Sequence, residues 1–214
     1  MNKNFAPIVS LCVGLACTPT FGADIAVAEI AVADIAVEGG TASFVVSTNM
    51  PAISVKGKST ALQAHARVQH TPEGLHIEQI EATIPVKSIL TGMSIRDEHM
   101  RRYIFTTGDG KIPDLRFEAD SAACGAPAGK NGESTCQLTG TLAIRGVPRA
   151  FTIPLKLHAD GTAFRASGDA TVKLSDYGIQ QPSQFGVRTS NEIQLHLEFT
   201  GKEAPAAIAS GGRR

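Results

Sequence analysis

Residues 94–105, with the sequence SIRDEHMRRYIF, carry the densest group of ionisable side chains in this chain. Six of the seven positions from Arg96 to Arg102 are charged or ionisable, whereas charged residues make up only 19% of the whole sequence. Asp97 and His99 could take part in acid–base chemistry, but residues two apart do not share a helical face. No Ser or Cys nucleophile accompanies them in a recognisable motif. The pattern therefore favours a structural role and predicts no enzyme.

The histidines outside this cluster do not have the spacing of metal ligands. His65, His70, His76, His158 and His196 form no HxH or HxxxH pair. Most of them alternate outward on segments that are expected to be strands. We therefore expect no metal site and no cofactor.

The ionisable cluster is expected to lie on a short helix over one end of the molecule. Thr91 or Ser94 could cap the start of this helix. Asp97 lies near its start and Arg101 nearer its end, an order that suits the helix dipole. The expected apolar side consists of Met93, Met100, Tyr103 and Ile104.

After Gly40 the chain alternates apolar and polar residues with the period of β-strands. The clearest example is 192–199, where Ile, Leu, Leu and Phe alternate with Glu, Gln, His and Glu. In 74–88 the alternation changes phase, which predicts a bulge near Gln79. The pattern predicts roughly eight antiparallel strands, each with one solvated face. A closed barrel and a two-sheet sandwich both satisfy it.

Small residues occupy many of the positions expected to face inward. An eight-stranded barrel has an interior that side chains can fill or that can hold one small ligand. The small residues favour a long apolar cavity; the alternative is that a helix or a facing sheet fills the space. The expected wall of this cavity is Leu62, Ala64, Ala66, Val68, Phe117, Leu142, Ile144, Ile153, Leu155, Phe164, Ala166, Ala170, Ile193, Leu195 and Leu197.

The N-terminus, MNKNFAPIVSLCVGLACTPTFGA, has the organisation of a secretory signal. Lys3 supplies a positive start, residues 5–17 are apolar, and small residues near 20–22 predict cleavage at about residue 22–23. An uncleaved anchor and lipidation of Cys17 are the alternatives. A five-residue unit that repeats over 24–38 is read as a spacer whose last copy enters the first strand.

Cys124 and Cys136 remain after the expected cleavage and predict a disulfide. Closing a loop of that size is worth about 3 kcal/mol in the chain-entropy model. A redox-active dithiol is the alternative, but the CxxC spacing is absent.

The overall charge argues against a nucleic-acid partner. Lys plus Arg and Asp plus Glu are equal at 20 each, so no excess of basic residues is available for a phosphate backbone. No later apolar run is long enough for a transmembrane helix, so stable membrane insertion is not expected. A homodimer is left open.

Three segments in order resemble the YceI family. SIRDEHMRRYIFTTGDGKIPDLRFEA resembles its R-D-x-H-L-R helix motif, which is followed by a turn, a Pro and a T-F or R-F strand. QLTGTLAIRGVPRAFTIPLKL resembles the next hairpin of the family, and LSDYGIQ with NEIQLHLEFTG resembles its closing pair. The resemblance covers residues 35–201. The departures are Ile104 in place of an acidic residue, an extra residue in TTGDGKIP, the cysteine pair, and the absence of Trp.

The resemblance implies an all-β, antiparallel, eight-stranded lipocalin-like barrel with a short helix between strands. It also implies a periplasmic protein that holds a polyisoprenoid or another long-chain apolar molecule in a tunnel, without catalysis. Arg96, His99 and Arg101 are expected to meet the polar head of such a ligand at the mouth. The alternative is a ligand-free secreted interaction or stress-response module with a filled core. The expected organisation is a signal at 1–23, a spacer at 24–34, the barrel at 35–201 and a tail at 202–214.

Overall fold

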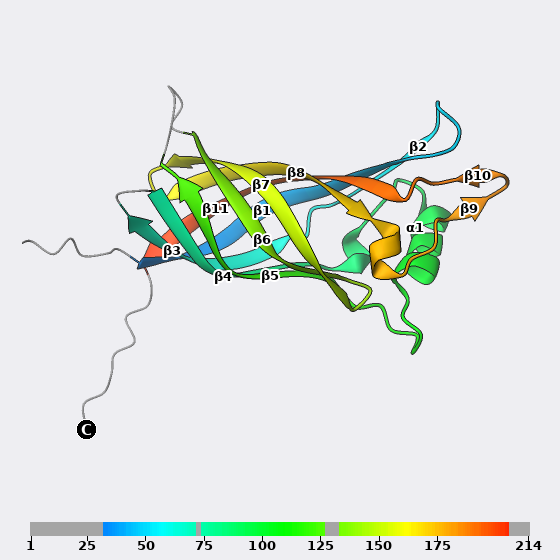
Figure 1. The fold of residues 1–214 in the computed structure, drawn as a ribbon, viewed down its shortest axis with the longest axis horizontal. Helices are drawn as coiled ribbons and strands as arrows, with labels where there is room; N and C mark the ends of the chain where they lie inside the picture. Colours follow the sequence, from blue (N-terminus) through cyan, green and yellow to red (C-terminus); the bar gives the residue numbers. More distant parts are fainter. Residues whose placement is uncertain (1–31, 72–73, 127–132, 206–214) are drawn as a thin grey trace, which may run out of the picture.

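Eight long antiparallel strands form a closed barrel in the computed structural model, which describes residues 32–71, 74–126 and 133–205 (Figure 1). The eight strands are β1 (Val32–Ser47), β3 (Gln63–Thr71), β4 (Gly74–Ile84), β5 (Leu115–Gly125), β6 (Glu133–Ile144), β7 (Val147–Asp160), β8 (Ala163–Lys173) and β11 (Glu192–Pro205).

The barrel closes through the pairing of its first and last strands. The order is β11-β8-β7-β6-β5-β4-β3-β1, and β1 then pairs with β11. This closure confirms the expected eight-stranded barrel and rules out the sandwich. The pairing extends to Ala33 and Pro205, so the barrel extends beyond the expected bounds of 35 and 201 at both ends.

Smaller elements gather at one end of the barrel. β2 (Ser54–Ser59) pairs with the second half of β1, and β9 (Ser183–Gln184) forms a short hairpin with β10 (Val187–Arg188). Two 3-10 turns, η1 (Val86–Ser88) and η3 (Leu174–Tyr177), follow β4 and β8.

A bulge at Gln79 keeps one apolar face of β4 turned inward. Gln79 has a φ of 51°, and the register between β3 and β4 shifts at this point. As a result Ile77 and Ile80, which are three residues apart, are both buried. The bulge that the change of phase predicted is confirmed.

Large side chains fill the space that the small inward-facing residues leave. A Cβ atom added at Gly168 would lie 2.6 Å from the Leu155 side chain, and one added at Gly201 would lie 2.5 Å from the Phe164 ring. Glycine is therefore needed where a bulky side chain from the neighbouring strand crosses it. This is why small residues in this barrel do not produce a long tunnel.

The ionisable cluster lies on α1 (Ser94–Met100), which continues into the π-helical turn η2 (Arg101–Phe105) between β4 and β5. The N-cap is Met93 and carries no side-chain cap, so the expectation that Thr91 or Ser94 caps this helix is wrong.

The buried side of this helical segment agrees with the expected one only in part. Met100 is buried and Ile104 half-buried, as expected, whereas Met93 and Tyr103 are 54% and 64% exposed and Phe105 is buried instead. The π-turn explains the difference, because i to i+5 bonding places residues five apart on one face.

Among the described residues, no helix has the length and apolar character needed to cross a membrane.

Candidate functional site

All but one of the residues that were expected to line a ligand cavity lie on strands of the barrel, and the exception is Leu62, which precedes β3. All fifteen are buried or half-buried. Nine belong to the largest apolar cluster: Ala66, Val68, Phe117, Ile153, Leu155, Phe164, Ala166, Ala170 and Leu197. Leu142, Ile144, Ile193 and Leu195 pack instead against the cluster around η3, while Leu62 is buried and Ala64 is half-buried outside these clusters.

A partly open apolar cavity of about 70 Å³ lies among these side chains. It brings together five of the expected wall residues: Ala64, Ala66, Leu155, Phe164 and Ala166. Eight further apolar residues line it that were not among the expected wall residues: Ile35, Val37, Leu75, Ile77, Ile80, Leu138, Leu157 and Phe199. Their strand alternation was the available signal, and Ile35 and Val37 belong to the last copy of the five-residue unit, which was expected to enter the first strand.

The cavity is small for a lipid. An engineered cavity of about 150 Å³ is the size that accepts benzene. The barrel in this conformation is therefore largely packed, and a long apolar chain could enter only if the interior widened.

Two polar side chains also border the cavity. His65 and Glu203 contribute to its lining, and the Glu203 carboxylate lies 2.8 Å from Nε2 of His70. The Glu203 side chain is only 15% exposed. It was missed because the barrel domain was expected to end at residue 201.

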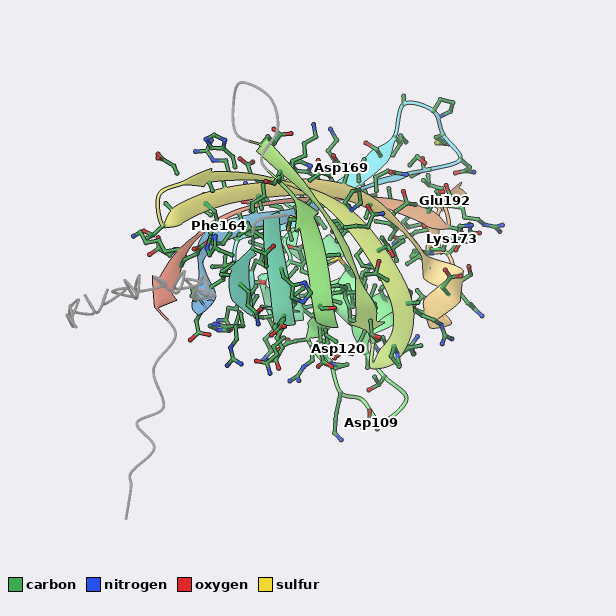
Figure 2. The ribbon with its side chains drawn as sticks, turned by 60° about the vertical axis from the view of Figure 1, so that its left-hand side comes forward. Asp109, Asp120, Phe164, Asp169, Lys173 and Glu192 are labelled. Atoms are coloured by element: carbon green, nitrogen blue, oxygen red, sulfur yellow. A yellow bond between two sulfur atoms is a disulfide. The ribbon has the colours of Figure 1, made fainter. Side chains whose placement is uncertain are left out.

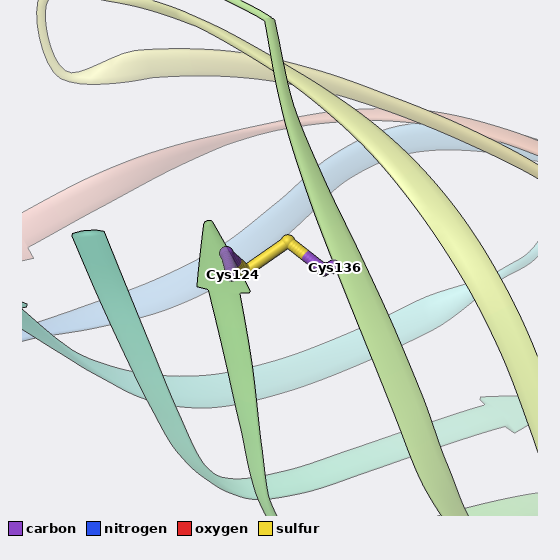
Figure 3. Close-up of a disulfide and its surroundings, with 2 residues drawn as sticks. All are labelled: Cys124 and Cys136. Carbon is purple, nitrogen blue, oxygen red and sulfur yellow. A yellow bond between two sulfur atoms is a disulfide. The ribbon is translucent and has the colours of Figure 1, made fainter. Parts of the chain in front are cut away.

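A disulfide joins β5 to β6 next to the cavity. Cys124 and Cys136 are both buried and bonded to each other, which confirms the predicted pair (Figure 3). The register between the two strands is interrupted from the Glu118–Thr141 pair to the cysteine pair. The covalent bond therefore closes the wall where regular backbone pairing is interrupted.

Asp97 and Arg96 hold the loop before α1 in place. Asp97 is 5% exposed and accepts hydrogen bonds from the backbone N–H of Thr91, at 2.7 Å, and from its hydroxyl. Arg96 donates through Nε to the Thr91 hydroxyl oxygen, at 2.9 Å, and through Nη2 to the Thr91 carbonyl, at 2.6 Å. These bonds give both residues a structural role.

The three residues that were expected at the ligand mouth do not meet the cavity. Arg96 is bonded to Thr91, and the exposed His99 ring lies edge-on to Tyr103 with centroids 5.7 Å apart. Arg101 donates weakly to the Lys87 carbonyl at 3.4 Å, and its Nε is buried without a partner. α1 joins the end of β4 to the start of β5, whereas the cavity lies toward the opposite ends of these strands.

A second, larger concavity lies on the outside of the barrel. This groove of about 1070 Å³ crosses β1, β3, β4, β5 and β6 and is lined by outward-facing residues such as Asp34, Arg67, Glu81 and Asp120. Asp120, which lines this groove, and Asp169, which does not, are both exposed on the outside of the barrel (Figure 2). The polar lining does not suit an apolar ligand. Within the described ranges, no three His, Cys, Asp or Glu side chains are placed to hold a metal ion.

Two solved structures share this fold. The structure of BcnA from Burkholderia cenocepacia has a TM-score of 0.56 at 20% identity, and covers 75% of this chain and 95% of its own. A structure described as a polyisoprenoid binding domain from Saccharophagus degradans has a TM-score of 0.59 at 14% identity, and covers 79% of this chain and 98% of its own. These likenesses extend over almost the whole of the two solved chains and over about three quarters of this one, and they establish the shared architecture.

Sequence comparison identifies the family. A UPF0312 protein of Pseudomonas paraeruginosa is 33% identical over 130 residues, and one from Pseudomonas savastanoi is 26% identical over 129 residues. The matched region covers 58% of this chain and 62% of each of these curated relatives. The model of the YceI-like domain matches residues 34–201, which is nearly all of the described barrel. The chain belongs to the YceI-like domain family.

Proposed function

We propose that the protein binds a long-chain apolar molecule, either a polyisoprenoid or a fatty-acid-like lipid, inside its barrel. The observation that carries the proposal is the apolar cavity, which side chains from β1, β3, β4, β6, β7, β8 and β11 line. Burying each methylene of a chain contributes about 0.8 kcal/mol, so such a ligand needs few polar contacts. The shared fold with a domain described as polyisoprenoid binding supports the same choice.

The interior has to widen to admit such a chain. The Phe164 and Phe199 rings pack edge-to-face with centroids 6.3 Å apart, and both line the present cavity. Rotation of these rings would lengthen the cavity along the barrel axis. Between the Glu118–Thr141 pair and the disulfide, β5 and β6 lack regular backbone pairing, so this part of the wall can bow outward while the covalent bond keeps the strand ends together.

Binding without catalysis is part of the proposal. Asp97 and Arg96, the central members of the ionisable cluster, are engaged with Thr91 and hold the loop. We also place the protein in the periplasm. The disulfide supports this location because such bonds persist in oxidising compartments. The expected signal at 1–23 lies outside the described residues.

A second candidate is a ligand-free interaction module with a filled core. The small volume of the cavity, about 70 Å³, favours this second candidate, because a long apolar chain does not fit into it. It predicts that no apolar molecule enters the barrel under native conditions, whereas the first candidate predicts saturable uptake.

Uptake of a fluorescent long-chain fatty acid separates the two candidates. The parent protein should show saturable uptake, and Ala64→Leu should weaken it because the added side chain occupies the cavity. Ala150→Leu, on the exposed outer face of β7, is the matched control and should bind as the parent does. Absence of saturable uptake by the folded parent would leave the filled-core module as the function.

A further inference from the structure

The end of the barrel that carries α1 also carries most of the exposed apolar side chains. We define the helix-end surface as residues 48–62, 85–114, 144–149 and 174–191, which lie together at one end of the long axis (Figure 1). It contains eight of the nine large apolar side chains that are exposed among the described residues. These eight are Met50, Ile53, Leu90, Met93, Ile95, Tyr103, Ile112 and Phe185. Clustering of this kind on a soluble domain marks an interaction site.

The same surface is basic. Its segments contain ten Lys or Arg and five Asp or Glu, a net charge of +5. The other described residues contain six Lys or Arg and twelve Asp or Glu, a net charge of −6. The neutral overall composition therefore conceals a basic helix-end surface and an acidic remainder of the barrel.

Phe185 is presented to solvent by a hairpin that is held in place. It lies in the two-residue turn between β9 and β10, is 95% exposed, and has a φ of 51°. Bulky residues rarely adopt this backbone region. Asn49 fixes the hairpin, because its side chain donates to the Gly186 carbonyl at 3.1 Å and accepts from the Arg188 N–H at 2.8 Å.

Cationic and apolar groups alternate on the rest of the surface. The Arg102 guanidinium lies 5.6 Å from the centre of the Tyr103 ring, which is itself exposed. Lys58 and Leu90 exchange backbone hydrogen bonds of 2.9 Å, so a lysine and an exposed leucine are neighbours. Apolar residues flanked by Lys and Arg are the combination that binds the interface of a charged bilayer.

We propose that the helix-end surface docks the protein on an anionic phospholipid bilayer. Phe185, Ile95 and neighbouring apolar side chains enter the boundary between headgroups and acyl chains, while the surrounding Lys and Arg meet the lipid phosphates. The acidic opposite end then faces away from the membrane. This docking goes beyond the proposed ligand binding and does not depend on it.

A second copy of the chain fits this surface less well than a bilayer does. In a two-fold dimer the same patch occupies both sides of the interface, so a surface of +5 would face its own copy. Contact between the basic end of one molecule and the acidic end of the next does not close, and would continue into filaments.

Sedimentation with vesicles tests the docking. The protein should sediment with vesicles of mixed phosphatidylglycerol and phosphatidylcholine, but not with phosphatidylcholine alone, and added salt should release it. Lys87→Gln with Arg102→Gln should weaken binding by about fivefold per charge. Lys156→Gln with Arg165→Gln, which removes two exposed charges from β7 and β8, is the matched control and should bind as the parent does. All variants keep the same N-terminus, so a difference between them maps to this surface.

A tryptophan reporter locates the contact. The chain contains no Trp, so Phe185→Trp introduces a single fluorophore at the hairpin tip. Its emission should shift to the blue when phosphatidylglycerol vesicles are added, whereas Thr162→Trp in the exposed β7–β8 turn should not respond.

Three results would overturn the proposal. The first is no sedimentation with anionic vesicles, and the second is binding that Ile95→Ser with Phe185→Ser leaves unchanged in a folded protein. The third is a dimer in solution, measured by light scattering, that this double variant dissociates, because the surface would then be a self-association face. Fluorescent fatty-acid uptake, measured in parallel without vesicles, tests the interior separately.

Discussion

The two ends of the barrel are closed by different physical means. At the disulfide end a covalent bond joins β5 to β6, and a small cavity lies behind it. At the helix end the closure is noncovalent: Val86, Ile89, Met100 and Phe105 form an apolar cluster under α1, and Asp97 fastens the adjoining loop.

The surfaces of the two ends also differ, in apolar exposure and in charge. The helix end exposes apolar side chains and is basic, whereas the disulfide end is acidic and its strands expose mainly polar residues. The difference indicates separate roles for the two ends: the helix end contacts an external surface, and the disulfide end adjoins the cavity.

Removal of the disulfide should have the largest effect on stability. The bond closes a loop with a sequence separation of 12. Replacing Cys124 and Cys136 together by Ala should lower the free energy of unfolding by about 3 kcal/mol, because the unfolded chain gains freedom. Urea unfolding with and without a reductant measures this. An unchanged midpoint for the parent after full reduction would show that the disulfide end does not rely on its covalent bond.

Loss of the Asp97 carboxylate should have the next largest effect, at the helix end. Asp97→Ala removes the acceptor for two Thr91 donors, and a lost charged acceptor of this kind costs about 2 kcal/mol. Glu98→Ala, on the exposed side of the same helix, is the control and should change stability by less than about 0.5 kcal/mol. Thermal unfolding compares them; equal effects would contradict the fastening role of Asp97.

The β4 bulge near the cavity predicts a change of opposite sign. Gln79 has a φ of 51°, so Gln79→Gly should raise stability by up to about 1 kcal/mol by removing strain at this position. The same substitution at Gln137, which is exposed in a regular strand, should lower stability by about 0.5–1 kcal/mol. Denaturant unfolding of the two variants tests the contrast, and two changes of the same sign would refute it.

The smallest expected effect is a dependence of folding stability on pH, which comes from Tyr177 at the helix end. Burial, and then the charge of Asp176, raise the pKa of Tyr177 above its ordinary value of 10.0. The folded state therefore favours the neutral phenol, so this contribution is complete below pH 10.0 and is lost as the pH rises through the raised pKa.

The matched variants for this effect are Tyr177→Phe and Tyr103→Phe. Tyr177→Phe should reduce the alkaline loss of stability, whereas Tyr103→Phe, at an exposed position, should not. Unfolding at neutral and strongly alkaline pH measures both, and identical pH profiles for the two variants would contradict the assignment.

The barrel could be predicted because the alternation of apolar and polar residues within each strand indicates which of its side chains are buried. In β11 the alternation from Ile193 to Phe199 indicates which side chains face inward. In β4 the phase change at Gln79 indicates where the strand must bulge. These signals are local, so the sequence alone carries them.

The cavity and the roles of the ionisable residues could not be predicted in the same way. Small residues such as Gly168 suggested a tunnel, but Leu155 from the adjacent strand occupies the space. The Glu203–His70 pair joins residues from β11 and β3, which only barrel closure brings together. Such features depend on the three-dimensional arrangement of residues far apart in the sequence.

Native mass spectrometry of the protein isolated from its own cells tests the proposed interior ligand most directly. The proposal predicts an added mass of an apolar molecule that organic solvent extracts, and its loss or marked reduction in Ala64→Leu but not in Ala150→Leu. A bare mass for the parent, together with no saturable uptake of the fluorescent fatty acid, would contradict it and identify the barrel as a filled module.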